Sequence, residues 1–208
     1  FVLMQMNQEA LPVNPEALPV NPEAAPGFSD VGKDHWAKSD IDFMVNKKII
    51  TGYSDGTFKP DQPVTRAEFT LLLVRMLAIP EAKEQCAFRD IQLNDWYNGA
   101  IAAAYQKGLV NGYDTGCFYP DNPVTREEAA VLLINALKYR GEISEQSPAV
   151  AELEKFNDKE KISTWACNAV AQALQENIVH GFPDGAFKPL ESTTRAQAVT
   201  MLRKLCNE

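Results

Sequence analysis

Gly52-Tyr53-Ser54-Asp55-Gly56-Thr57-Phe58-Lys59-Pro60 is followed by Val64-Thr65-Arg66-Ala67-Glu68 and an apolar run that ends at Leu77. The same arrangement returns at residues 112–120 with 124–128, and again at 181–189 with 193–197. Three copies of one pattern predict a fold built from three repeats. At 208 residues, the chain can bury a core either as one domain or as three interlocked small units.

Thr65 and Glu68 have the spacing of a capping box. In this motif the threonine hydroxyl accepts a hydrogen bond from the third helical amide, and the glutamate accepts one from the threonine amide. A helix is therefore predicted to begin at Arg66, with Phe69 and Leu72 on its buried face. The same caps are expected from Thr125 with Glu128 and from Thr194 with Gln197.

An arginine follows each capping threonine, at Arg66, Arg126 and Arg195. A cation in the first helical turn is mildly unfavourable, because the helix dipole is positive at that end. Its recurrence in three repeats predicts an anion close by, bound by guanidinium and helix amides together. Structural pairing with the carboxylate of Asp30 or its equivalents in another repeat stays open as the alternative.

A second helix is predicted ahead of each glycine turn, opened by a tryptophan at Trp36, Trp96 or Trp165. The tryptophans are expected to be core anchors first, with a secondary role in a groove. The apolar positions that share one helical face are Ile41, Met44, Val45 and Ile49, then Ile101, Ala104, Tyr105 and Leu109, then Val170, Ala173, Leu174 and Ile178. Gly108 and Asn177 suit a left-handed residue at the helix end, whereas Lys48 does not obviously do so.

Composition narrows the classes of function. The hydrophobic content of 45% and charged content of 23% are typical of a soluble globular protein, and the net charge of −8 argues against general nucleic-acid binding. No apolar run is long enough for a transmembrane segment. The four cysteines lack the spacing of a zinc or redox site and are expected to be free thiols, with Cys206 buried. No cofactor or metal is predicted.

Two segments fall outside the repeat pattern. Residues 1–27 contain closely spaced prolines and are predicted to form a semi-rigid linker. The opening Phe1 suggests a mature or excised piece of a longer protein. Residues 140–155 form a charged insert that is expected to be flexible.

The combination of Phe-x-Asp, a tryptophan at the helix start, the glycine turn and Thr-Arg-Ala-Glu closely resembles the S-layer homology repeat. Three copies are expected at residues 28–87, 88–155 and 156–208, the second with the insert at its end. The resemblance implies a mainly α fold, in which three helix-turn-helix repeats pack with pseudo-threefold symmetry around a central helical bundle. It also implies non-covalent anchoring of a bacterial surface protein to the cell wall, through secondary cell-wall polysaccharide that carries pyruvate ketals.

A ketal-linked pyruvate is a carboxylate, which fits the arginines. The resemblance therefore implies ligand binding by Arg66, Arg126 and Arg195, by Lys59 and Lys188, by the three tryptophans, and by Gly56, Gly116 and Gly185. Glycine in the turn permits positive φ and close approach of a ligand. Because Tyr119 replaces lysine in the second repeat and Gln197 replaces glutamate in the third, unequal sites are expected.

Other functions are weighed against this one. An enzyme is not expected, because His35 and His180 occupy non-equivalent positions and no nucleophile has a supporting motif. The Asp-Gly turns lack the alternating oxygen ligands of a calcium loop. A structural or oligomerisation module, and a module that binds modified peptidoglycan, stay open. The expected location is the extracellular bacterial cell wall or surface layer, with fusion to a larger surface protein.

Overall fold

The structure is a computed structural model that describes residues 27–143 and 150–206. Within these ranges the protein is mainly α-helical, with isolated β-bridges and no strand. The helices are α1 (Lys38–Asn46), α2 (Arg66–Met76), α3 (Asn98–Gln106), α4 (Arg126–Tyr139), α5 (Cys167–Gln175) and α6 (Arg195–Lys204), with 3-10 helices η1 (Val150–Lys155) and η2 (Lys159–Lys161). The mainly α prediction is confirmed. The proline-rich linker, apart from Gly27, lies outside the described residues.

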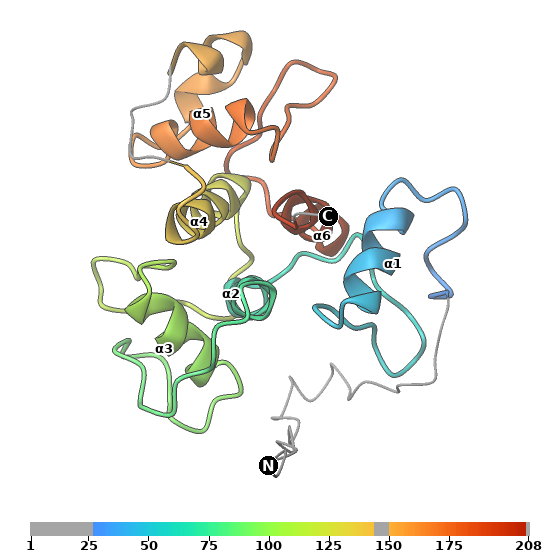
Figure 1. The fold of residues 1–208 in the computed structure, drawn as a ribbon. Helices are drawn as coiled ribbons and strands as arrows, with labels where there is room; N and C mark the ends of the chain where they lie inside the picture. The colour runs from blue at the N-terminus through green and yellow to red at the C-terminus, as the bar shows by residue number, and fades with distance from the viewer. Residues whose placement is uncertain (1–26, 144–149, 207–208) are drawn as a thin grey trace.

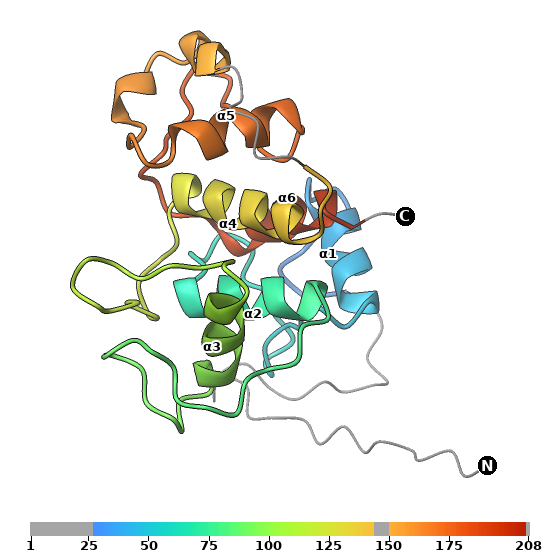
Figure 2. The same cartoon turned by 60° about the vertical axis from the view of Figure 1, so that its left-hand side comes forward.

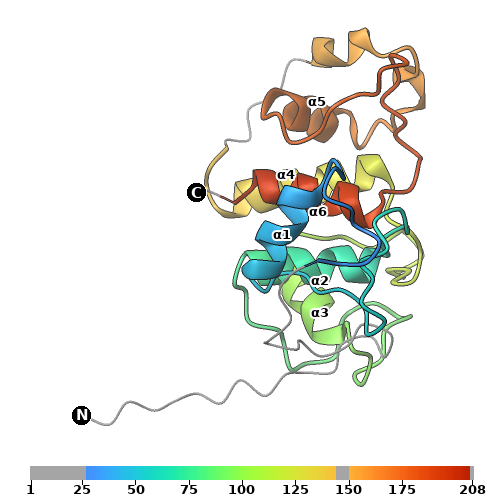
Figure 3. The same cartoon turned by 90° about the vertical axis from the view of Figure 1, so that its right-hand side faces the viewer.

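The capped helices α2, α4 and α6 form the centre of the molecule, and α1, α3 and α5 lie outside them (Figure 1). Turned views show the central helices running side by side (Figures 2 and 3). Each central helix contacts the other two. The central helices are therefore buried around most of their surface rather than on one stripe. For example, Leu71 and Val74 on the predicted second stripe of α2 are as buried as Leu72.

The outer helices pack on the central helix of a neighbouring repeat. The pairs in contact are α2 with α3, α4 with α5, and α6 with α1. In the described part of the chain, the two α-helices of one repeat have no Cα atoms within 8 Å of each other. The repeats are thus interlocked, and the last pair closes the chain between its first and last helices.

A ring of backbone hydrogen bonds joins the three residues that precede the capping threonines. The amide of Val64 donates to the carbonyl of Thr193, that of Thr193 to Val124, and that of Val124 to Val64, over 2.8–3.0 Å. All three residues are fully buried. Closed contacts of this kind are what a threefold arrangement requires, and the pseudo-threefold symmetry itself stays a prediction.

Several predicted details of the outer helices need correction. Tyr105, placed on the buried face, is 43% exposed, and Ile50 is buried where Ile49 is only half-buried. Lys48 adopts φ of 58°, so it makes the left-handed turn that Gly108 and Asn177 make at the same position. The helix ends in this way in all three repeats because the chain must reverse toward the glycine turn.

The insert and the cysteines also depart in part from expectation. Residues 150–155 of the insert form η1, which packs on α5 and buries Leu153, so this part is ordered by an apolar contact. Residues 144–149 lie outside the described residues. All four cysteines are free thiols, as predicted. Cys206 is half-buried rather than buried, with its sulfur 4.0 Å from that of Met44.

Candidate functional site

All three capping boxes are present at the starts of α2, α4 and α6. The hydroxyl of Thr65 accepts from the amide of Glu68 at 3.2 Å, and the Glu68 carboxylate accepts from the Thr65 amide at 2.8 Å. The same reciprocal bonds occur at the second and third central helices, with Gln197 supplying the acceptor in α6. These caps fix where each arginine begins its helix.

Each arginine is buried against the glycine turn of the next repeat in the ring. Arg66 donates from Nε to the Phe118 carbonyl at 2.9 Å, and Arg195 donates in the same way to the Phe58 carbonyl at 2.9 Å. Arg126 donates to the carbonyl of Phe187 at 3.0 Å. A second carbonyl accepts from Nη2 of each guanidinium, at Asn111 for Arg66, His180 for Arg126 and Thr51 for Arg195.

Two aromatic rings enclose each guanidinium. The Arg195 Cζ atom lies 4.9 Å from the Tyr53 ring centre and 4.8 Å from that of Phe58. The corresponding rings are Tyr113 and Phe118 around Arg66, and Phe182 and Phe187 around Arg126. Burial lowers the pKa of Arg126 to about 10, which still leaves it charged at neutral pH. The arginines thus hold neighbouring repeats together.

Among the described residues, the three arginines form no ion pair within 4 Å with Asp30 or its equivalents, although Asp158 attracts Arg126 from a greater distance. Asp30 accepts from the amides of Phe58 and Lys59 at 2.8 and 2.7 Å, within its own repeat. Asp90 and Asp158 hold the other two turns in the same way. The aspartates are needed there because the residue after each turn phenylalanine has a left-handed backbone, with φ of 56°, 55° and 59°.

The other predicted site residues, the turn glycines and two lysines, have different surroundings. Gly56, Gly116 and Gly185 have φ of 79°, 75° and 78°, as their role in the turn requires. Lys59 lies over the Tyr53 ring, with Nζ 3.9 Å from its centre. Lys188 is within 3.4 Å of the Asp184 carboxylate. Ligand binding by any of these residues stays a prediction.

The tryptophans are not equivalent, and the prediction that they are core anchors is wrong for two of them. Trp36 and Trp165 are 61% and 60% exposed. Trp96 is half-buried against the core and lines a groove. The difference follows from the neighbouring central helix: the Trp96 groove includes Leu71 and Arg75 of α2.

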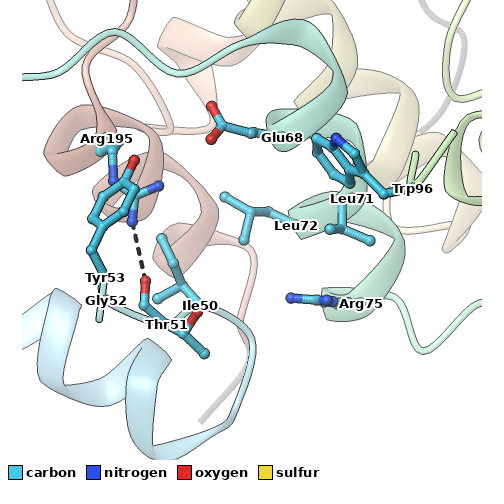
Figure 4. A pocket seen from close by; sticks show the side chains of 10 residues that line it. All are labelled: Ile50, Thr51, Gly52, Tyr53, Glu68, Leu71, Leu72, Arg75, Trp96 and Arg195. Carbon is cyan, nitrogen blue, oxygen red and sulfur yellow. Dashed lines mark hydrogen bonds between the residues drawn. The ribbon is translucent and has the colours of Figure 1, made fainter. Parts of the chain in front are cut away.

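This groove, called here the Arg195 groove, lies between three repeats (Figure 4). The groove is open to solvent. Tyr53 and Arg195 lie on one side, Trp96 and Arg75 on the other, and Leu72 lies between them (Figure 4). The groove is lined by Ile50, Thr51, Gly52, Tyr53, Glu68, Leu71, Leu72, Arg75, Trp96 and Arg195.

The glycine turn of the second repeat, where Arg66 takes the place that Arg195 has at the first turn, is surrounded by different groups. There Arg66 forms an ion pair with Glu128 at 2.9 Å, and the Tyr113 hydroxyl donates to the same carboxylate. Burial, followed by this hydrogen bond, raises the pKa of Tyr113 to about 12. A separate hollow beside it is lined by Phe88, Tyr105 and Tyr113, among others. Among the described residues, Arg126 and Arg195 have no comparable ion pair.

Arg75 was missed at the sequence level. It lies between core residues of α2, and its guanidinium reaches the groove (Figure 4). The only signal was a polar residue within an apolar run, at a position where the other repeats have Asn135 and Lys204. That signal alone does not distinguish a solvent-exposed residue from a groove residue.

In the described ranges no group of histidine, cysteine, aspartate or glutamate side chains is arranged to hold a metal ion. Over the same ranges, no helix combines the length and apolarity needed to cross a bilayer.

Comparison with known proteins places these features in a family. Residues 27–70, 87–130 and 155–199 each match the S-layer homology domain. The chain is 35% identical over 175 residues to an amylopullulanase of Thermoanaerobacterium thermosulfurigenes, a match that covers 84% of this chain and 9% of that protein. It is 31% identical over 178 residues to an S-layer protein of Bacillus thuringiensis subsp. finitimus, covering 85% of this chain and 21% of that protein.

A cellulosome-anchoring protein of Acetivibrio thermocellus is 28% identical over 160 residues, covering 75% of this chain and 35% of that protein. The chain thus spans only a small part of the relatives it matches. The three family matches coincide with the three interlocked repeats and their capped helices. The chain therefore belongs to the S-layer homology domain family.

Proposed function

We propose that this chain anchors a bacterial surface protein to the cell wall without covalent linkage, by binding pyruvylated secondary cell-wall polysaccharide in grooves between repeats. The localisation that follows from the family is the bacterial cell surface. The names of two relatives, an S-layer protein and a cellulosome-anchoring protein, agree with it. The small share of each relative that the chain covers supports fusion to a larger protein.

The observation that carries the proposal is the Arg195 groove. It combines two guanidinium groups, the aromatic rings of Tyr53 and Trp96, and an apolar floor at Leu72. Aromatic rings and aliphatic side chains suit the apolar faces of sugar rings, and guanidinium groups suit a carboxylate. At a net charge of −8, local pockets rather than bulk attraction must provide affinity for an anionic polymer.

The three sites are proposed to be unequal. All three arginines are bonded to the neighbouring turns, but only Arg66 is also paired with a carboxylate, that of Glu128. Lys59, Lys188 and the turn glycines remain proposed contributors. Trp36 and Trp165, which are exposed and do not line the Arg195 groove, offer aromatic surface to another protein.

The test is calorimetric titration with a terminal pyruvylated cell-wall sugar and with the same sugar lacking pyruvate. We expect Trp96→Ala to weaken binding and the matched control Trp36→Ala to leave it unchanged, because both tryptophans open an outer helix but only Trp96 lines the groove. Absence of binding to both sugars by folded protein would overturn the proposal.

The exposed Trp36 and Trp165 favour a second candidate, a structural or oligomerisation module. Sedimentation at rising concentration tests it: growth of the oligomer that Trp36→Ala and Trp165→Ala abolish supports this role. Binding to modified peptidoglycan in place of the polysaccharide is tested by sedimentation with isolated sacculi.

A further inference from the structure

Two arginines line the Arg195 groove, and Arg195 is largely occupied by the protein itself. Its Nε and Nη2 atoms donate to the carbonyls of Phe58 and Thr51 at 2.9 and 3.1 Å. The Tyr53 and Phe58 rings enclose its guanidinium. Arg195 is 6% exposed. Two of its five N–H donors are thus used within the protein, and its burial leaves little of the guanidinium accessible to a ligand.

Arg75, on the Trp96 side of the same groove, differs from Arg195 in its bonding. Its side chain is half-buried, and within the described residues its guanidinium makes no hydrogen bond and no ion pair within 4 Å. Burial lowers the pKa of Arg75, and Glu81 opposes this shift only from a distance. A partly desolvated cation without a bonded counter-charge is a receptor for an anion.

The position of Arg75 distinguishes the first repeat from the others. Asn135 occupies it in α4, where its side-chain amide donates to the Leu109 carbonyl at 3.0 Å and is neutral. Lys204 occupies it in α6 and is exposed. A partly buried guanidinium at this position is therefore specific to the Arg195 groove.

One face of α2 gives this groove two ends of opposite charge. Glu68, Leu72 and Arg75 follow one another at i, i+4 and i+7, which places them on the same side of the helix. The Glu68 carboxylate repels another carboxylate and accepts hydrogen bonds from hydroxyl groups. A sugar with one acidic substituent is thus favoured with its hydroxyls toward Glu68 and its acid toward Arg75.

We infer that Arg75, rather than the arginine that follows the capping threonine, binds the acidic substituent of a cell-wall sugar whose ring lies over Leu72 beside Trp96. The inference rests on the proposed function and assigns the selectivity of that site. Arg195 then shapes the groove as a structural residue. The ligand class is a saccharide that carries a carboxylate at one end.

The experiment titrates the full chain with the pyruvylated wall sugar and with its counterpart lacking pyruvate. Arg75→Gln is expected to weaken binding of the acidic sugar by about ten- to a hundredfold, the loss of one charge-assisted contact, and to leave the neutral sugar unchanged. Arg75→Lys should retain part of the preference for the acidic sugar. Lys204→Gln, at the equivalent position of α6, is the matched control and should change neither affinity.

The outcomes separate this inference from the function it rests on. If the unaltered chain binds neither sugar, both fail. If it binds the acidic sugar and Arg75→Gln binds equally well, or loses both sugars to the same degree, only the role of Arg75 fails. Melting temperatures identify any variant that loses sugar binding because it is less well folded. If Arg75→Gln is such a variant, the affinities of Arg75→Lys for the acidic and the neutral sugar are compared instead.

Discussion

Arg66 donates a hydrogen bond from Nε to the carbonyl oxygen of Phe118, 52 residues further along the chain, while its guanidinium lies 4.5 Å from the centre of the Phe118 ring. The same relationship joins Arg126 to Phe187 and, across the closure of the ring, Arg195 to Phe58. The arginine at this position thus links two neighbouring repeats, and this link occurs three times. Its position in the first helical turn lets it reach the neighbouring turn without crossing the core.

Arg126→Ala should destabilise the fold by roughly 2–4 kcal/mol, because it leaves the buried carbonyl of Phe187 and the partly buried carbonyl of His180 without their donor. Urea unfolding followed by circular dichroism measures the change. Lys138→Ala, an exposed position of the same helix, is the control and should change stability by less than about 0.5 kcal/mol. Equal effects for the two variants would contradict the structural role.

Gly52→Ala should destabilise strongly, because a Cβ atom there would lie 2.0 Å from Cε1 of Phe28 and 2.7 Å from the Thr57 carbonyl oxygen. Gly32→Ala is the matched control, since nothing lies within 4 Å of its added Cβ and its φ is not positive. We expect a lower melting temperature for the first variant and almost none of that loss for the second. A folded Gly52→Ala protein with unchanged melting would show that Phe28 can move away.

Thr193→Val should stabilise the protein by about 1 kcal/mol. Thr193 is fully buried, and its hydroxyl has no hydrogen-bond partner within the described residues. Val64 and Val124 occupy the equivalent places in the central ring. The reverse change, Val124→Thr, should be destabilising. Chemical denaturation of both variants checks the prediction, and it fails if the two changes have the same sign.

We expect the ionisation of Tyr113 to destabilise the protein at alkaline pH. Burial and the hydrogen bond to Glu128 raise the pKa of Tyr113 to about 12. The contribution of Tyr113 to the free energy of unfolding is therefore fully present below pH 10, the usual pKa of tyrosine, and is lost as the pH rises toward about 12. The free energy of unfolding should fall over this window, and less so in Tyr113→Phe. Comparing the two proteins isolates Tyr113 from Tyr97, whose pKa is raised to the same value. Parallel curves would exclude the effect.

A fragment of residues 28–143 should fail to fold cooperatively, because it retains α1 but lacks α6, the helix on which α1 packs. Adding residues 150–208 as a separate peptide should restore helical content and a sharp thermal transition. Circular dichroism at several mixing ratios measures this. Cooperative melting of the first fragment alone would mean that the repeats fold independently of the closure.

The sequence predicts local structure well where the hydrogen-bonding groups that fix it are close together in the chain. The caps at Thr65 and the left-handed residue at Gly108 depend on atoms within four residues. The roles of Arg66 and Trp36 could not be read in this way. The carbonyls that bind Arg66 lie 45 and 52 residues away, and whether a tryptophan is covered depends on which helix a neighbouring repeat places beside it.

The pairing of α1 with α6 determines how the protein responds to force. A tandem array that stacks in a line has two ends at which each terminal unit is held from one side, and tension peels such an array unit by unit. Here, tension applied ahead of α1 passes first to α6 and then to the other two central helices, so the load is shared by the whole ring before any helix separates. Such sharing suits a domain that must resist pulling as a single mechanical unit.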